Sequence, residues 1–381
     1  TDFLTAVFPA RLFSEKLATW FASAQRDLPW REAENARDPY RVLVSEVMLQ
    51  QTTVAAVIPF YRRFLERFPT VQNLAAAPLD DVMPLWAGLG YYSRARLLHR
   101  CAQAVIEKYG GEFPALVEEI QALPGVGRYT AGAVASISRN QKAPIVDANV
   151  ARVFARIFLL EGDLKSTANQ KTLWQRAEEI VQSCDEDELS PVRPSVVNPA
   201  LMELGALVCT PRSPDCAHCP VQQFCGAYRS GRQNELPHRT PKQQTVELRD
   251  VCAFIFDAST QNVLLRQRAH DQKIWWRGMW ELPRTTCREN ETARDALLRL
   301  LRDELRLGDV EIGEHLKTVT HGVTHHHISL ECWSAEVSST RLSTQMPPGV
   351  AWYEWDETAH LALPSSMGSL LKWLRRHGGQ A

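Results

Sequence analysis

The sequence predicts a multi-domain chain of two parts, an all-α region over residues 1–229 and an α+β region over residues 251–381. At 381 residues the chain is too long for one core, since domains average about 150 residues. Apolar residues recur at three- and four-residue spacings in the first part, as on one face of a helix. Segments typical of strands occur in the second part. Residues 230–250 show little apolar periodicity and are expected to form a linker.

The helical pattern of the first part is clearest in four segments separated by Pro, Gly, Asn and Asp, which punctuate helices. Asp38 before Pro39 is typical of a helix start, with a capping carboxylate and a proline at the first helical position. The four segments are residues 11–25, 40–52, 91–109 and 169–183.

The second part mixes strands and helices. Residues 251–257 and 262–268 are expected to form a hairpin with its turn at residues 259–262. Two helices interrupt the strand pattern, which places this region in the α+β class. The further expected strands are residues 326–337 and 351–356, and the helices are residues 291–305 and 364–377.

Composition excludes some classes of function. The chain has 43 basic and 44 acidic residues and a net charge of −1, which argues against binding nucleic acid through bulk charge. No apolar run reaches the roughly 18 residues of a membrane helix. The first residues lack the pattern of a secretory signal, so a cytoplasmic location is expected.

Four of the nine cysteines stand close together, with the spacing C-x6-C-x2-C-x5-C. Four thiolates this close suit a tetrahedral sulfur site, which holds either a [4Fe–4S] cluster or zinc. Structural zinc sites usually pair two C-x2-C units and only one is present, so the pattern favours iron–sulfur. Four thiolates leave no open coordination position, and a structural role is expected. The four residues are Cys209, Cys216, Cys219 and Cys225.

Residues 123–128 form a glycine-rich turn ahead of a helix of small residues. Gly125 and Gly127 allow a tight turn that leaves backbone N–H groups at a helix N-terminus, where anions bind. We expect this anion to be a DNA phosphate. A turn that only packs two helices has the same pattern.

Two carboxylates stand out from their surroundings. Glu46 lies in an apolar helical stretch, where burial should raise its pKa and keep it protonated. Asp147 follows an apolar stretch at the start of a helical pattern. A satisfied core or surface acid and a plain N-cap are the alternatives for these two residues.

These motifs resemble, in their order along the chain, the helix-hairpin-helix DNA glycosylases with an iron–sulfur cluster, specifically the MutY family of adenine DNA glycosylases. The resemblance covers essentially the whole chain. It implies a helix-hairpin-helix domain with a [4Fe–4S] loop, followed by a Nudix-like domain that reads 8-oxoguanine. It also implies a monomer of the bacterial nucleoid that excises adenine opposite 8-oxoguanine or guanine in double-stranded DNA, with a linker that contacts repair proteins. The matching segments are residues 45–52, 85–96, 123–133, 146–153 and the four cysteines.

The resemblance assigns catalysis to the two carboxylates. It implies that Glu46 protonates adenine and helps to activate water, and that Asp147 stabilises the cationic sugar. Breaking an N-glycosidic bond requires an acid for the leaving base and an anion for the oxocarbenium-like sugar. Tyr129 and Asn149 are expected to orient Asp147 and the sugar.

Tyr129 distinguishes two branches of the family. Glycosylases of the endonuclease III type carry a lysine at this point, which forms a Schiff base and cuts the strand. This chain has no lysine between Lys108 and Lys142. The resemblance therefore implies a monofunctional glycosylase that leaves an abasic site, and a bifunctional glycosylase and lyase is the alternative.

Several further positions are implied to contact DNA. Gln51 and Tyr91 match groups that fill the double helix around the flipped base, and Leu89 is also expected to contact DNA. Arg26 and Arg31 match contacts to adenine and to a nearby phosphate.

Residues 323–325 stand where the family has a Phe-Ser-His motif that contacts 8-oxoguanine. Thr324 keeps a hydroxyl that can accept the N7 hydrogen of 8-oxoguanine, His325 follows it, and Val323 lacks the aromatic ring. A metal site at His325–His327 is disfavoured because successive strand residues point to opposite faces.

Pro199 is a second departure from the family pattern, since relatives carry a polar residue near the flipped adenine, and Glu203 one turn later receives no role.

Nudix hydrolysis is disfavoured because residues 291–305 lack the paired acids of a metal-binding helix. A DNA-binding protein without catalysis would be expected to lose Glu46 or Asp147. Both residues are present, which disfavours this alternative.

Overall fold

The computed structural model describes residues 8–238, 244–269, 275–337 and 346–377, and the chain divides into two compact units. One comprises Thr1–Ala77 and Ser93–Pro241, and the other comprises Pro78–Tyr92 and Lys242–Ala381. The first unit is helical and the second is α+β, so both predicted fold classes are confirmed. The periodicity of the sequence did not indicate that Pro78–Tyr92, which carries helix α6 (Leu79–Trp86), groups with the second unit.

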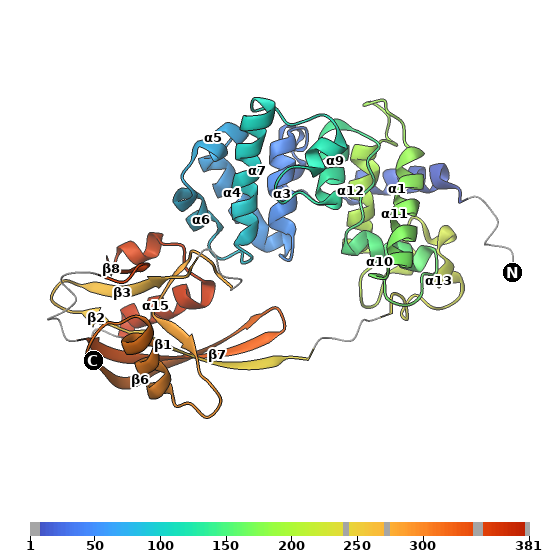
Figure 1. Cartoon of the computed structure of the whole chain (residues 1–381). Coiled ribbons are helices and arrows are strands. Elements are labelled where there is room, and N and C mark those ends of the chain that lie inside the picture. The colour runs from blue at the N-terminus through green and yellow to red at the C-terminus, as the bar shows by residue number, and fades with distance from the viewer. Residues whose placement is uncertain (1–7, 239–243, 270–274, 338–345, 378–381) are drawn as a thin grey trace. The chain divides into compact units, whose positions relative to one another are not determined.

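Helices form nearly all the regular structure of the first unit (Figure 1). Three short 3₁₀ turns accompany them, at Pro29–Arg31, Cys216–His218 and Gln222–Phe224. The helices are α1 (Ala10–Ala24), α2 (Ala33–Ala36), α3 (Pro39–Leu49), α4 (Val54–Arg67), α5 (Val71–Ala76), α7 (Ser93–Tyr109), α8 (Val117–Gln121), α9 (Arg128–Arg139), α10 (Ala148–Ile157), α11 (Thr167–Gln182), α12 (Pro194–Leu207) and α13 (Gly226–Arg229).

Side-chain caps begin many of these helices. Asp38 accepts a hydrogen bond from the backbone N–H of Tyr40 at 2.8 Å, with Pro39 as the first helical residue, as predicted. Thr53 caps α4 and Ser166 caps α11 in the same way. An N-cap satisfies donors that the helix itself leaves unpaired, which fixes where each helix begins.

One buried apolar cluster joins α1, α10, α11 and α12, with Phe13, Leu17, Phe154 and Leu204 at its centre. Separately, α3 packs against α9 and α4, and α12 packs against α9. The two carboxylates singled out by the sequence therefore reach one region, from α3 and from the start of α10. None of the described helices combines the length and the apolarity needed to cross a membrane.

The second unit contains two sheets. The first has the strand order β5-β1-β7-β6, and the second has the order β2-β3-β4 with β8 paired to β3. Strands β1 and β7 are parallel and the remaining pairs are antiparallel. The predicted hairpin is present between β2 and β3. The strands are β1 (Val246–Phe254), β2 (Phe256–Asp257), β3 (Asn262–Gln267), β4 (Trp280–Glu281), β5 (Arg284–Thr286), β6 (Val310–Val323), β7 (His326–Val337) and β8 (Val350–Glu354).

Helices cover both faces of the sheet that contains β1. Val251 and Ala253 pack in the core beneath α14 (Ala293–Leu298), which continues as a π-helical stretch at Arg299–Glu304. Cys252 and Phe254 pack in the core beneath α15 (Ser365–His377). This alternation follows from the two-residue period of a strand.

Candidate active site

A cavity of about 1110 Å³ lies within the first unit. Residues from α1, α3, α9, α12 and the start of α10 line it. They include Glu46, Tyr129 and Asp147, together with Arg26, Arg31 and Glu203. Candidates that are far apart in the sequence thus line one cavity.

Glu46 is buried on α3, with 5% of its surface exposed. Its Oε2 atom accepts a hydrogen bond of 2.5 Å from the hydroxyl of Tyr129. Burial raises the pKa of Glu46 to about 7, and the nearby Asp147 adds to the rise, while the Tyr129 hydrogen bond and Arg31 oppose it. Because its pKa is close to neutral, this carboxyl can both give and take a proton near pH 7.

Tyr129 follows the glycine turn in the first turn of α9. Its hydroxyl contacts Glu46 and lies 3.9 Å from the sulfur of Met202, whereas we expected it to orient Asp147. Burial, followed by the nearby carboxylates, raises the pKa of Tyr129 well above its ordinary value. The phenol therefore stays protonated and acts as a donor to Glu46.

Asp147 caps the N-terminus of α10. Its Oδ1 accepts from the backbone N–H of Val150 at 2.7 Å, and its Oδ2 accepts from Nδ2 of Asn149 at 3.0 Å. Burial raises the pKa of Asp147, and these hydrogen bonds counteract the rise. The helix N-terminus also favours an anion. The expected contact between Asn149 and Asp147 is present.

A second layer of contacts holds Asn149. Arg152 donates to Oδ1 of Asn149 at 2.8 Å and to the carbonyls of Gly205 at 2.7 Å and Cys209 at 2.8 Å. A Cβ atom on Gly205 would lie 2.6 Å from that of Asn149, so α12 can approach α10 only with glycine here. Arg152 and Gly205 were not among the residues predicted from the sequence. The i, i+3 spacing of Asn149 and Arg152 on a helix is the signal that could have found the pair.

Glu203 is the main functional candidate to which the sequence analysis gave no role. Its carboxylate, 1% exposed, accepts from Arg26 at 2.7 and 2.8 Å and from Arg31 at 2.9 and 3.1 Å. Burial alone would raise the pKa of Glu203, but the hydrogen bonds from the two arginines outweigh it and lower the pKa to about 2. Both guanidinium groups therefore bind this carboxylate, beside Pro199 in the cavity wall.

The glycine turn joins α8 to α9 beside the cavity. Gly125 has φ +78°, and a Cβ atom there would lie 2.6 Å from Leu97. Gly127 is the N-cap of α9, where no side chain caps the helix, and the space around its missing Cβ is open. Such an uncapped N-terminus suits an anion.

The expected DNA-filling residues fall in different units. Gln51, at φ +60°, lines the cavity in the first unit. Tyr91 is 51% exposed at φ +49° in the second unit. Leu89, for which we expected a contact with DNA, is also in the second unit and is buried.

Thr324 and His325 form the turn between β6 and β7. Val323 pairs with His326 across the two strands, which leaves these two residues as the loop. Thr324 has φ +55°, and its hydroxyl donates to the carbonyl of Val323 at 2.6 Å. The hydroxyl is exposed and its oxygen keeps the capacity to accept from a ligand.

The four cysteines of the motif line one small, mostly apolar cavity next to α10 and α12. Among the residues that the structure describes, no group of three or more His, Cys, Asp or Glu side chains could hold a metal ion. Thiols that surround a cavity without meeting at one point suit a polynuclear cluster better than a single zinc ion. Arg156 donates to Sγ of Cys209 at 3.2 Å, and His218 is exposed.

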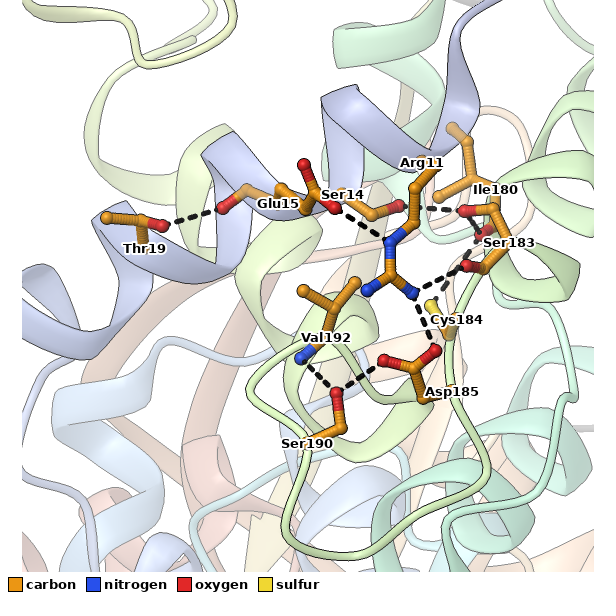
Figure 2. A network of polar contacts seen from close by, with 10 residues as sticks. All are labelled: Arg11, Ser14, Glu15, Thr19, Ile180, Ser183, Cys184, Asp185, Ser190 and Val192. Carbon is orange, nitrogen blue, oxygen red and sulfur yellow. Dashed lines mark hydrogen bonds and ion pairs between the residues drawn. The ribbon is translucent and has the colours of Figure 1, made fainter.

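A polar network ties the loop of residues 185–192 to α1 (Figure 2). Arg11 on α1 donates to Oδ1 of Asp185 at 2.7 Å, and Ser190 donates to Oδ2 of Asp185 at 2.6 Å. Pro191 at the end of this loop lines the cavity. The ion pair is half exposed and contributes little stability by itself, so the loop depends on the whole network.

Comparison with known proteins bears on the helical part, the cysteine motif and the second unit. Residues 44–179 match the family model described as HhH-GPD superfamily base excision DNA repair protein. Residues 209–225 match the iron–sulfur binding domain of endonuclease III, and residues 251–373 match the NUDIX domain. The second unit therefore has a Nudix fold.

Relatives of nearly the whole chain share one name. The chain is 35% identical to the adenine DNA glycosylase of Mus musculus, over 96% of this chain and 78% of that protein. It is 29% identical to the adenine DNA glycosylase of Buchnera aphidicola (strain APS), over 96% of this chain and 98% of that protein. A solved thermostable thymine-DNA glycosylase superposes with a TM-score of 0.50 at 31% identity, over 58% of this chain and 97% of that one.

Proposed function

The chain belongs to the adenine DNA glycosylase family, and from this premise we propose that it excises adenine opposite 8-oxoguanine or guanine and leaves the strand uncut. Family membership makes the protein a DNA repair enzyme that hydrolyses N-glycosyl bonds and carries a [4Fe–4S] cluster. The choice of opposite base and the residue roles below are our proposals.

Glu46 is the proposed acid and base. In its protonated form it gives a proton to N7 of a flipped adenine, and the bonding pair of the N-glycosidic bond leaves with the base. The resulting carboxylate then activates the water that adds to the sugar. A pKa of about 7 supports both steps, and the Tyr129 hydroxyl keeps the side chain in one orientation.

Asp147 is the proposed partner of the cationic sugar. Its donors, Val150 N–H and the Asn149 amide, stabilise the carboxylate form that must face a positive charge. Arg152 and Gly205 act only through Asn149, as positioning residues. The shared cavity of Glu46 and Asp147 is the single observation that carries this mechanism.

Glu203 with Arg26 and Arg31 forms the proposed wall for the adenine. A fixed carboxylate and two guanidinium groups supply acceptors and donors of the kind that a purine edge requires. Flipping a base costs a few kcal/mol, which contacts in such a wall must offset.

We do not expect the enzyme to cut the DNA strand. Among the described residues that line the cavity there is no lysine, so a Schiff base has no nucleophilic amine there. Lys142 instead lies 3.5 Å from Glu186.

The four cysteines fit a [4Fe–4S] cluster because all of them line one cavity. When bound, the cluster supplies a structural cross-link between the segments that carry its thiolates. Arg156, through Cys209 Sγ and the carbonyl of Thr210, ties α10 to this loop.

A single-turnover assay tests the proposal. Labelled duplexes place adenine opposite 8-oxoguanine, guanine or thymine, and each sample is quenched with and without hot alkali. We expect strand breaks only after alkali, formed fastest opposite 8-oxoguanine. Breaks without alkali would establish a lyase, and equal rates opposite 8-oxoguanine and guanine would contradict the proposed base preference.

A further inference from the structure

Three aromatic rings gather at the turn between β6 and β7. The rings of His325 and His326 are 4.0 Å apart, and the ring of Trp275 meets that of His326 edge-on at 4.8 Å. Trp275 comes from the segment before β4, which is distant from the turn in the sequence. It is only partly buried, so part of its surface remains available beside the turn.

The neighbour of Trp275 anchors this arrangement. The guanidinium groups of Arg284 and Arg268 lie over the ring of Trp276, at 4.9 and 5.3 Å from its centre, and the ring of His321 lies 5.7 Å away. Arg284 is buried and bound to Asp250. These contacts fix the segment that carries Trp275, so its ring is held in place rather than free to swing.

The charges around the rings suit a nucleic acid. The acids near the anchor are paired, Asp250 with Arg284 and Glu281 with Arg268 at 2.6 Å. On β1, Glu247 accepts from Nδ1 of His327 on β7 at 2.7 Å. Each of these three carboxylates therefore has a hydrogen-bond partner among the described residues, which lessens its repulsion of a phosphate backbone.

From this geometry we propose that Trp275 determines specificity, by packing its ring, together with His326, against the nucleobase opposite adenine. The proposal rests on the proposed preference for 8-oxoguanine and on the contact with that base that the family resemblance implies for Thr324 and His325. Thr324 discriminates by accepting a hydrogen bond, and the ring pair supplies the apolar surface that holds the base against this acceptor. Any base can pack against an aromatic ring in this way, so the packing alone does not select a base. Trp275 adds to selectivity because it holds the base in the position where Thr324 can accept its hydrogen bond.

The test compares Trp275→Ala with a matched control. Trp333 meets His315 edge-on at 5.5 Å across the same two strands, away from the turn, so Trp333→Ala removes an equivalent ring pair. Single-turnover excision rates and dissociation constants are measured on duplexes with adenine opposite 8-oxoguanine and opposite guanine, using the full chain.

We expect Trp275→Ala to lower the ratio of the two excision rates by about tenfold, the scale of one lost stacking contact. Trp275→Phe keeps a ring and should restore most of the ratio, and Trp333→Ala should leave the ratio unchanged. A double variant of Trp275 and His326 should lose less than the sum of the single effects, because the two rings act together.

An unchanged ratio in Trp275→Ala, or an equal loss in Trp333→Ala, would overturn this inference while leaving the proposed function intact. A wild-type chain with no preference for 8-oxoguanine would instead overturn the proposed base preference, and this inference with it. The wild-type measurement therefore distinguishes the two failures.

Discussion

The hydroxyl of Tyr129 donates to Oε2 of Glu46 at 2.5 Å, whereas Asp147 receives its hydrogen bonds from its own helix. The two acids thus share one cavity but are controlled by separate elements. Tyr129 adjusts the proton affinity of Glu46, and Asn149 orients Asp147. This separation allows one acid to be protonated while the other is stabilised as an anion.

Removing the Tyr129 hydroxyl should shift the pH dependence of excision. Protonated Glu46 is the proposed acid, so the rate should fall as pH rises through its pKa of about 7. The Tyr129 hydrogen bond lowers this pKa, and Tyr129→Phe should move the falling limb to higher pH. A pH–rate profile under single-turnover conditions checks the shift, and a limb that stayed in place or moved lower would contradict it.

Glu46 should make the fold less stable at alkaline pH. Because burial raises its pKa from 4.5 to about 7, its contribution to stability is full below about pH 4.5 and is lost as pH rises to about 7. Glu46→Gln stays neutral and should be more stable than the wild type by roughly 3 kcal/mol above pH 7, with a smaller gain near pH 5.5. Urea unfolding at both pH values measures the difference. A gain of equal size at both would show that ionisation is not the cause.

Loss of the Glu203 charge should destabilise the first unit. Glu203→Gln leaves Arg26 and Arg31 facing each other without an anion, and breaking a buried ion pair costs about 3 kcal/mol. Glu186→Gln is the control, because Glu186 is 80% exposed and its pairing with Lys142 contributes little. Urea unfolding should show a large loss in the free energy of unfolding only for Glu203→Gln. Similar losses in both variants would show that the ion pairs of Glu203 contribute no more than an exposed pair.

A methyl group on Gly205 should displace Asn149. The new Cβ would lie 2.6 Å from the Asn149 Cβ and 3.1 Å from its backbone, which cannot be relieved by rotating a side chain. We expect Gly205→Ala to slow excision by at least about tenfold, because the amide that orients Asp147 shifts. Gly368→Ala is the control, since no atom lies within 4 Å of its added Cβ, and it should leave excision unchanged. Equal rates in the two variants would show that Asn149 does not depend on this close approach.

The parts of the fold that the sequence predicted are those with local causes. The periodicity of residues 11–25, 40–52, 91–109 and 169–183 matches helices α1, α3, α7 and α11 to within a few residues. The start of α3 at Pro39 follows from its cap, and the turn before β3 follows from its polar residues. Such features depend on neighbours in the chain and can be predicted without tertiary structure.

The parts of the structure that could not be predicted from the sequence depend on how the helices pack. Glu203 meets Arg26 and Arg31 only because α12 lies beside α1 and the segment after it, and no local pattern encodes that contact. Tyr129 contacts Glu46 because α9 packs on α3. The burial of Leu89 likewise depends on tertiary packing, which no local pattern encodes.

The most direct test of the proposed mechanism is the Asp147→Asn variant, assayed for excision and for binding to a duplex with adenine opposite 8-oxoguanine. Asparagine is as good an N-cap as aspartate, so α10 and the fold should be preserved. Without the anion, the excision rate should fall by at least about a hundredfold, while the dissociation constant should stay within about threefold of the wild type. Excision at the normal rate would contradict the assignment of Asp147 as the group that stabilises the sugar cation.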